Sequence, residues 1–256
     1  MAFVKTLNWK LREHRQLRQM DVKHSLVRDA LSRNYRAASF SRWNDIPKEI
    51  ASEMGCVFSQ RTPGHALREI FIERIYDMRG FVPHKGDTVV DVGASYGDSA
   101  IYWSRVCGAH VIAFEPLAGA FNILQENVRL NNTDVHAFNI ALGDGNPINS
   151  AESGGMLFVC GNGAPVATRR LDDFAIDRAD ILKIDVEGFE VAVLRGSAET
   201  IRKLRPRVII ETHSSELRHE TEKIMSELGY GLAAVGRTIR NRSAMDEITN
   251  LFFLPS

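Results

Sequence analysis

The sequence predicts an α/β fold built on a mostly parallel, doubly wound sheet, and three observations support this prediction. From residue 88 onward, apolar runs of strand length alternate with amphipathic helical runs, which is typical of parallel strands connected by covering helices. The first apolar run is joined to a helical run by a turn that contains Gly93 and Gly97, as in folds that bind nucleotides. The last two apolar runs have only a short polar link, residues 236–247, so we expect them to pair antiparallel.

The elements follow from the spacing of apolar residues and of glycine and proline. Helices are expected at 7–38 and 65–79, with a mixed segment between them. Strands are expected at 88–92, 110–114, 134–141, 180–186, 207–213, 231–235 and 249–254. Later helices are marked by three apolar faces: Leu117, Phe121, Leu124 and Val128; then Val191, Leu194, Ala198 and Ile201; then Leu217, Ile224 and Leu228.

Two segments depart from this rhythm. Residues 1–45 hold ten basic and four acidic residues, a formal charge of +6 in a chain whose total charge is zero. We therefore expect a basic, helical N-terminal extension over 1–64, joined to one α/β domain over 65–256. Residues 143–170 contain six glycines and only short apolar pieces, which predicts an inserted hairpin or flap rather than a crossover helix.

Several classes of protein are disfavoured by composition. The three cysteines, Cys56, Cys107 and Cys160, are widely spaced, so neither a zinc site nor a disulfide framework is expected. The sequence contains no apolar stretch of membrane-spanning length and no apolar leader at its N-terminus. We expect a soluble, cytoplasmic protein without a membrane span.

The glycine turn and the strand after it predict a cofactor site. Glu115 follows Gly97 by eighteen residues, at the end of the second apolar run, where a carboxylate usually accepts the ribose hydroxyls. The spacing of Gly93 and Gly97 after Asp91 differs from the Gly-x-Gly-x-x-Gly of NAD enzymes and favours S-adenosylmethionine (SAM). Asp91 is expected near the amino-acid end of SAM, or else as a cap for N–H groups of its own loop. The cofactor-binding candidates are Asp91, Gly93, Ser95, Tyr96, Gly97, Glu115, Pro116, Ala141 and Asp185.

The ends of the fourth and fifth core strands supply the candidate catalytic residues. In a doubly wound sheet, ligands bind beyond these carboxyl ends. The candidates are Asp185, Glu187 and His213. For a hydroxyl acceptor, Glu187 or His213 is a candidate general base, and His213 is expected to titrate nearest neutrality.

Other interpretations of the same residues remain open. Asp185, Glu187 and His213 could hold Mg²⁺ or Mn²⁺, although we assign no metal ligands from the sequence. Glu187 and His213 could instead form a structural salt-bridge cluster. Lys183 is expected to pair with Glu211 or Asp185, because buried charges need partners.

These motifs resemble the FkbM family of class I SAM-dependent methyltransferases. The resemblance covers roughly residues 65–214. It rests first on the motifs around the cofactor site: the glycine turn at 91–97, Ala-Phe-Glu-Pro at 113–116, Asn127 with Asn131, and Ala-Leu-Gly at 141–143. It rests also on later motifs: Leu-Asp-Asp at 171–173, Ile-Leu-Lys-Ile-Asp-Val-Glu-Gly-Phe-Glu at 181–190, Val-Leu-Arg-Gly at 193–196 and Ile-Glu-Thr-His at 210–213. Ser95 stands where the family usually has asparagine, and Arg170 where it usually has threonine.

The resemblance implies a Rossmann-like, seven-stranded class I methyltransferase sheet, mostly parallel with its last strand antiparallel, preceded here by the N-terminal extension. It also implies SAM contacts from Asp91, Gly93, Gly97 and Glu115, with Asp185 close to the transferred methyl group. The expected activity is O-methylation of a saccharide, a lipid-linked or another small acceptor. The alternatives are an RNA ribose methyltransferase that uses the basic arm, and a non-catalytic SAM-binding or assembly protein. A homo-oligomer could form through the N-terminal helices.

Overall fold

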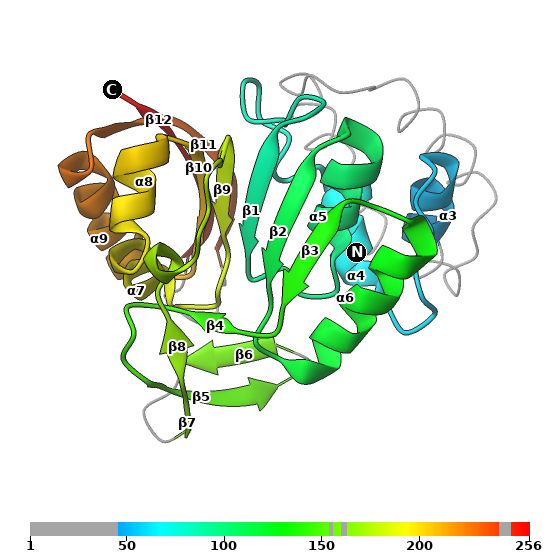
Figure 1. Ribbon diagram of the computed structural model, residues 1–256, viewed down its shortest axis with the longest axis horizontal. Helices are drawn as coiled ribbons and strands as arrows, with labels where there is room; N and C mark the ends of the chain where they lie inside the picture. The colour runs from blue at the N-terminus through cyan, green and yellow to red at the C-terminus, as the bar shows by residue number, and fades with distance from the viewer. Residues whose placement is uncertain (1–45, 154–155, 160–162, 241–246) are drawn as a thin grey trace, which may run out of the picture.

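The computed structural model describes residues 46–153, 156–159, 163–240 and 247–256 (Figure 1). The helix expected over 7–38, most of the basic extension and the oligomer expected through it lie outside these residues. The division of the chain at residue 64 therefore stays a prediction. Within the described ranges, no helix is long and apolar enough to cross a bilayer.

A seven-stranded sheet forms the centre of the described structure, in the order β11-β12-β10-β9-β1-β2-β3. Its strands are β1 (Thr88–Val92), β2 (His110–Phe114), β3 (Val135–Phe138), β9 (Ile181–Ile184), β10 (Arg207–Thr212), β11 (Tyr230–Arg240) and β12 (Glu247–Pro255). Pairing is parallel from β3 through β10, whereas β12 lies antiparallel between β10 and β11. The predicted class of sheet, with its antiparallel last strand, is confirmed.

Helices cover both faces of this sheet (Figure 1). One face carries α3 (Ile46–Glu53), α4 (Gly64–Arg68), the π-helix η2 (Glu69–Glu73), α5 (Asp98–Tyr102), the π-helix η3 (Trp103–Cys107) and α6 (Ala118–Asn131). The other carries the 3₁₀ turn η4 (Leu171–Asp173), α7 (Glu190–Arg195), α8 (Ala198–Leu204) and α9 (Ser215–Glu227). Neighbouring residues of one strand serve opposite cores, because side chains alternate across a sheet: Ile209 packs on the first face, Val208 and Ile210 on the second.

Three predicted elements differ from the structure. The helical run expected over 65–79 ends at Glu73, because Arg74 adopts a left-handed conformation and its buried side chain pairs with Asp77. The single helix expected around Val191 to Ile201 is two helices separated at Gly196, where the chain packs against the backbone of Gly143. The mixed segment before residue 65 contains α3, whose Ile50 belongs to the main core.

The inserted segment, expected as a hairpin or flap, contains a small sheet of its own. Strands β5 (Ile148–Ser153), β6 (Met156–Val159) and β7 (Ala164–Val166) pair antiparallel in the order β6-β5-β7. Two short strands, β4 (Ala141–Leu142) and β8 (Thr168–Arg169), pair parallel at its base. The expected third core strand, 134–141, is thereby divided into β3 and β4.

Candidate active site

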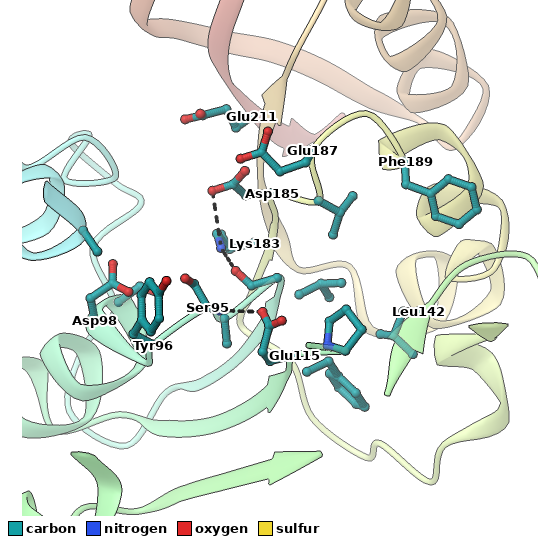
Figure 2. Close-up of a pocket in the computed structure, with 18 of the residues that line it drawn as sticks. Ser95, Tyr96, Asp98, Glu115, Leu142, Lys183, Asp185, Glu187, Phe189 and Glu211 are labelled. Carbon is teal, nitrogen blue, oxygen red and sulfur yellow. Dashed lines mark hydrogen bonds and ion pairs between the residues drawn. The ribbon is translucent and has the colours of Figure 1, made fainter. Parts of the chain in front are cut away.

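A cavity of about 310 Å³ lies beyond the carboxyl ends of β1, β2, β9 and β10 (Figure 2). Its walls come from the loops that follow these strands, from η2 and from the inserted segment through Ile148 and Ser150. Segments far apart in the sequence meet here because the parallel strands all end at one edge of the sheet. This is the place where the sequence predicted a ligand.

The glycine turn packs directly against the chain that follows β9. Gly93 has a φ of +78°, and a Cβ there would lie 1.8 Å from the carbonyl oxygen of Asp185. Gly97 has a φ of +80°, and its Cβ would lie 3.0 Å from Leu124 of α6. Only glycine combines this conformation with this close approach. The turn therefore forms a backbone cradle at the floor of the cavity.

Glu115 is held at the middle of the cavity by the glycine turn. Its carboxylate accepts the backbone N–H of Ser95 and that of Leu117, each at 2.8 Å. Burial raises the pKa of Glu115, and these two N–H donors oppose that effect. A carboxylate has about four acceptor positions, so two remain for hydroxyl donors of a ligand.

Asp91 and Lys183 form a buried ion pair beneath the cavity. Lys183 Nζ lies 3.1 Å from Asp91 Oδ1 and donates to the carbonyl oxygen of Gly93 at 2.6 Å. Ser99 donates to the other oxygen of Asp91 at 2.6 Å. Asp91 is fully buried and does not line the cavity. Burial would lower the pKa of Lys183, but the carboxylates of Asp91 and Asp185 raise it, so the lysine is charged.

The three candidate catalytic residues meet at one wall of the cavity. His213 Nε2 lies 3.3 Å from Glu187 Oε2 and 3.8 Å from Asp185 Oδ1. His213 Nδ1 donates to the buried carboxylate of Glu190 at 2.7 Å, which fixes the plane of the ring. Tyr76 donates its hydroxyl hydrogen to Asp185 Oδ2 at 2.8 Å, so Oδ1 faces the histidine.

The pKa values in this cluster differ from the expectation that His213, of the two candidate bases, titrates nearest neutrality. Burial raises the pKa of Glu187 to about 7; the charge of His213 lowers it, whereas those of Asp185, Glu190 and Glu69 raise it further. Burial would lower the pKa of His213, but the hydrogen bond to Glu190 and the surrounding carboxylates raise it to about 10. The expectation that His213 titrates nearest neutrality is therefore wrong. Glu187 titrates there, and His213 is an imidazolium.

A cation could also be held at this wall. Asp185, Glu211 and His213 each offer one ligand atom, and these three atoms lie within 4.8 Å of one another. His213 has its second nitrogen fixed by a carboxylate, as metal-bound histidines usually do. The hydrogen bond to Glu190 and the charge on His213 also suit an arrangement without metal.

The structure brings most of the sequence candidates to the cavity. Lining residues among them are Gly93, Ser95, Tyr96, Glu115, Pro116, Ala141, Asp185, Glu187 and His213. Asp91 and Gly97 lie behind the wall, where they support it. Lys183 pairs with Asp185, as expected, and mainly with Asp91.

Some cavity residues were not singled out from the sequence. They are Glu69, Tyr76, Asp98 and, among the supports, Glu190. Glu69 and Tyr76 lie in and just after η2, in a run that looks like an ordinary amphipathic helix. Asp98 directly follows the second glycine of the turn, and that position was the available signal.

Comparison with known proteins identifies the family. Residues 91–232, more than half of the chain, match the family described as the Methyltransferase FkbM domain. The chain belongs to this family. The FkbM match begins at Asp91, at the end of β1, and ends in β11, so it contains the glycine turn, Glu115 and the catalytic candidates.

Two relatives of this FkbM protein are themselves named as methyltransferases. Methyltransferase 1 of Beauveria bassiana is 30% identical over 196 residues, which are 62% of this chain and 77% of that protein. Methyltransferase sdnD of Sordaria araneosa is 26% identical, over 64% of this chain and 81% of that protein. The crystal structure of methyltransferase FkbM from Methylobacillus flagellatus aligns with a TM-score of 0.45 and 22% identity, over 65% of this chain. The present chain covers 43% of that solved chain.

Proposed function

We propose that this FkbM protein binds SAM in the cavity and methylates a hydroxyl oxygen of a small acceptor, such as a saccharide or a lipid-linked molecule. The observation that carries the proposal is Glu187, a carboxyl group with a pKa of about 7 at the wall of the same cavity as Glu115. A general base works best when its pKa is close to the working pH.

The residues of the cavity fit SAM from end to end. Glu115 lies between two unlike ends of the cavity, with Leu142 and Phe189 on one side and Tyr96 and Asp98 on the other (Figure 2). The apolar end suits an adenine ring, the Glu115 carboxylate suits the ribose hydroxyls, and the polar end suits the amino-acid part. SAM supplies an electrophilic methyl group on a sulfonium when it is bound.

We assign the acceptor side of the reaction to the cavity wall formed by Asp185, Glu187 and His213. Glu187 takes the proton of the acceptor hydroxyl, which makes the oxygen a better nucleophile. His213, held by Glu190, keeps its positive charge beside Glu187 and Asp185 and balances the carboxylates. Positioning of the two reactants in one cavity supplies much of the remaining acceleration.

The charge of the cavity supports a small acceptor over RNA. Its lining includes six acidic side chains: Glu69, Asp98, Glu115, Asp185, Glu187 and Glu211. The basic lining side chains are Lys183, His65 and His213, and Lys183 is already paired with Asp91. Asp98 and Glu187 carry only part of a negative charge at neutral pH, because their pKa values are raised to about 8 and 7, but the remaining carboxylates would still repel phosphate groups. A hydroxyl on an uncharged molecule meets no such penalty.

Transfer of labelled methyl from SAM into fractionated cell extract tests the proposal. Label in saccharide or lipid fractions that is absent with Glu187→Gln supports it, and label in RNA would overturn the small-acceptor assignment. Calorimetry tests the cofactor separately, and tighter binding of NAD than of SAM would contradict the proposed site.

Activation of the hydroxyl by a divalent cation at Asp185, Glu211 and His213 is the second candidate mechanism. The same labelling reaction in EDTA separates the two mechanisms. The Glu187 mechanism requires an unchanged rate, whereas a rate that is lost in EDTA and restored by Mg²⁺ or Mn²⁺ would replace it.

A further inference from the structure

Asp98 is a buried carboxyl group at one end of the cavity, with no assigned role in the proposed reaction. It begins α5, directly after Gly97, and only 9% of its surface is exposed. It lines the cavity beside Tyr96 (Figure 2). Among the described residues, no hydrogen bond or ion pair joins its side chain to another residue.

This carboxyl group has only its own backbone N–H as a hydrogen-bond donor, and among the described residues no other residue pairs with it. Burial of a carboxylate without a compensating partner is costly, and proteins usually supply an ion pair or hydrogen bonds. Here burial raises the pKa of Asp98 to about 8, although the charge of Lys183 opposes this effect. A cationic group arriving through the cavity would be the missing partner.

Asp91 cannot fill this role, although the sequence favoured it. Its carboxylate is fully buried, is not part of the cavity wall and already receives Lys183 and Ser99. Asp98 is seven residues further along the same turn, and its side chain reaches the cavity. The carboxylate available to a ligand at this end of the turn is therefore that of Asp98.

We propose that the Asp98 carboxylate accepts hydrogen bonds from the α-ammonium group of SAM. It thereby selects ligands that carry the amino-acid part. This inference rests on the proposed function. In the proposed arrangement Glu115 binds the ribose in the middle of the ligand, and Leu142 and Phe189 lie at the adenine end. The amino-acid chain therefore extends from the ribose over the glycine turn towards Asp98. The ammonium supplies a positive charge in direct contact and further N–H donors for the carboxylate.

The test compares three ligands that share the adenosine thioether. S-adenosylhomocysteine carries the whole amino-acid part, its deaminated analogue lacks only the ammonium, and 5′-methylthioadenosine lacks the amino-acid part entirely. By calorimetry, the unchanged protein should bind S-adenosylhomocysteine at least about tenfold more tightly than the deaminated analogue, as expected for a charge-assisted hydrogen bond. Equal affinity for these two ligands would overturn the proposal without any variant.

Two substitutions then locate the effect. Asp98→Asn should weaken S-adenosylhomocysteine at least about tenfold and leave 5′-methylthioadenosine within about twofold. Glu115→Gln should weaken both ligands, because both carry the ribose. Asp177→Asn, the same change at an exposed site, should alter neither. If Asp98→Asn weakens both ligands equally, or neither, Asp98 does not contact the ammonium.

The failure of this inference is distinguishable from failure of the proposed function. A protein that binds neither S-adenosylhomocysteine nor 5′-methylthioadenosine has no SAM site, and the proposed function fails. A protein that binds both, but is indifferent to Asp98→Asn, keeps its SAM site and loses only this assignment. A thermal melt of ligand-free Asp98→Asn, expected not to fall below that of the unchanged protein, shows that folding is preserved.

Discussion

At the scale of the residue, the contacts of His213 decide which side chain can act as a base. Its Nδ1 is tied to buried Glu190, and its Nε2 faces Glu187 and Asp185. These carboxylates keep the ring charged, with a pKa of about 10. A charged imidazolium has no lone pair to accept a proton. We therefore propose Glu187, whose pKa is raised to about 7, as the general base.

The dependence of kcat/KM on pH should show this assignment. We expect kcat/KM to rise with pH up to about 7 and then level off, because Glu187 must lose its proton before it can accept another. Glu187→Gln should lower kcat by about 10²- to 10⁴-fold and remove the rise. Glu227→Gln, on the exposed side of α9, is the matched control and should leave the profile unchanged. A profile that rises with a pKa near 10 would assign the base to His213 instead.

The sequence predicted which polar residues gather at the cavity. It did not predict which of the carboxylates are already paired within the protein. The pattern predicted Glu115, Asp185, Glu187 and His213 in one cavity, because strand ends of a parallel sheet meet. It could not show that Asp91 forms an ion pair with Lys183, since that pair depends on the register of β1 against β9. Asp91 lies beside Lys183 in that register, and the ion pair follows.

At the scale of the element, the strand-turn-helix unit at β1 and α5 is the part that tolerates least change. Gly93 has a left-handed conformation, and an added Cβ would lie 1.8 Å from the backbone oxygen of Asp185. A backbone atom cannot move aside as a flexible side chain can. The close contact fixes the distance between the glycine turn and the cavity wall that contains Asp185.

Gly93→Ala is therefore expected to destabilise the fold by more than about 3 kcal/mol, through both the strained φ and the overlap. Gly119→Ala is the matched control: Gly119 lies exposed near the start of α6 with no atom within 4 Å of its would-be Cβ. That change should stabilise the protein by about 0.5–1 kcal/mol, because alanine is the better helix former. Urea unfolding of the two variants measures both effects. A Gly93→Ala protein as stable as the unchanged chain would show that the turn can move.

Elements that periodicity predicted well are those whose ends are marked in the sequence. The strands β1, β2 and β10 match their expected ranges closely, and α6 contains most of the apolar face expected of it. The helix expected over 65–79 does not, because a buried ion pair between Arg74 and Asp77 and a hydrogen bond from Arg74 to Tyr102 turn the chain there. Tyr102 belongs to α5, so this ending depends on a distant element.

At the scale of the whole molecule, several buried groups hold protons more tightly in the folded state than they would in the unfolded chain. The pKa of Asp98 rises from 3.8 to about 8, that of Glu187 from 4.5 to about 7, and that of His213 from 6.5 to about 10. A group whose pKa is raised by folding contributes stability below its unfolded pKa and loses that contribution as the pH rises through its folded pKa. The three shifts act in the same direction.

The free energy of unfolding of the ligand-free protein should therefore fall steadily between pH 5.5 and 9. Asp87 and Asp172, whose pKa values are lowered, exert their effect at more acidic pH, outside this range. Urea unfolding at several pH values measures the slope, and Asp98→Asn should make it shallower. Stability that increases over this range would mean that these carboxyl groups are ionised in the folded protein at neutral pH.

The sequence by itself determined the class of sheet, the antiparallel last strand, the family and the set of polar groups at the strand ends. It could do so because side-chain periodicity and glycine turns are local properties of the chain. Only the tertiary structure decided that Lys183 neutralises Asp91, that Asp98 reaches the cavity unpartnered, and that Glu187 rather than His213 titrates near neutrality. These outcomes depend on burial and on the charges of residues distant in sequence, and both are set by packing.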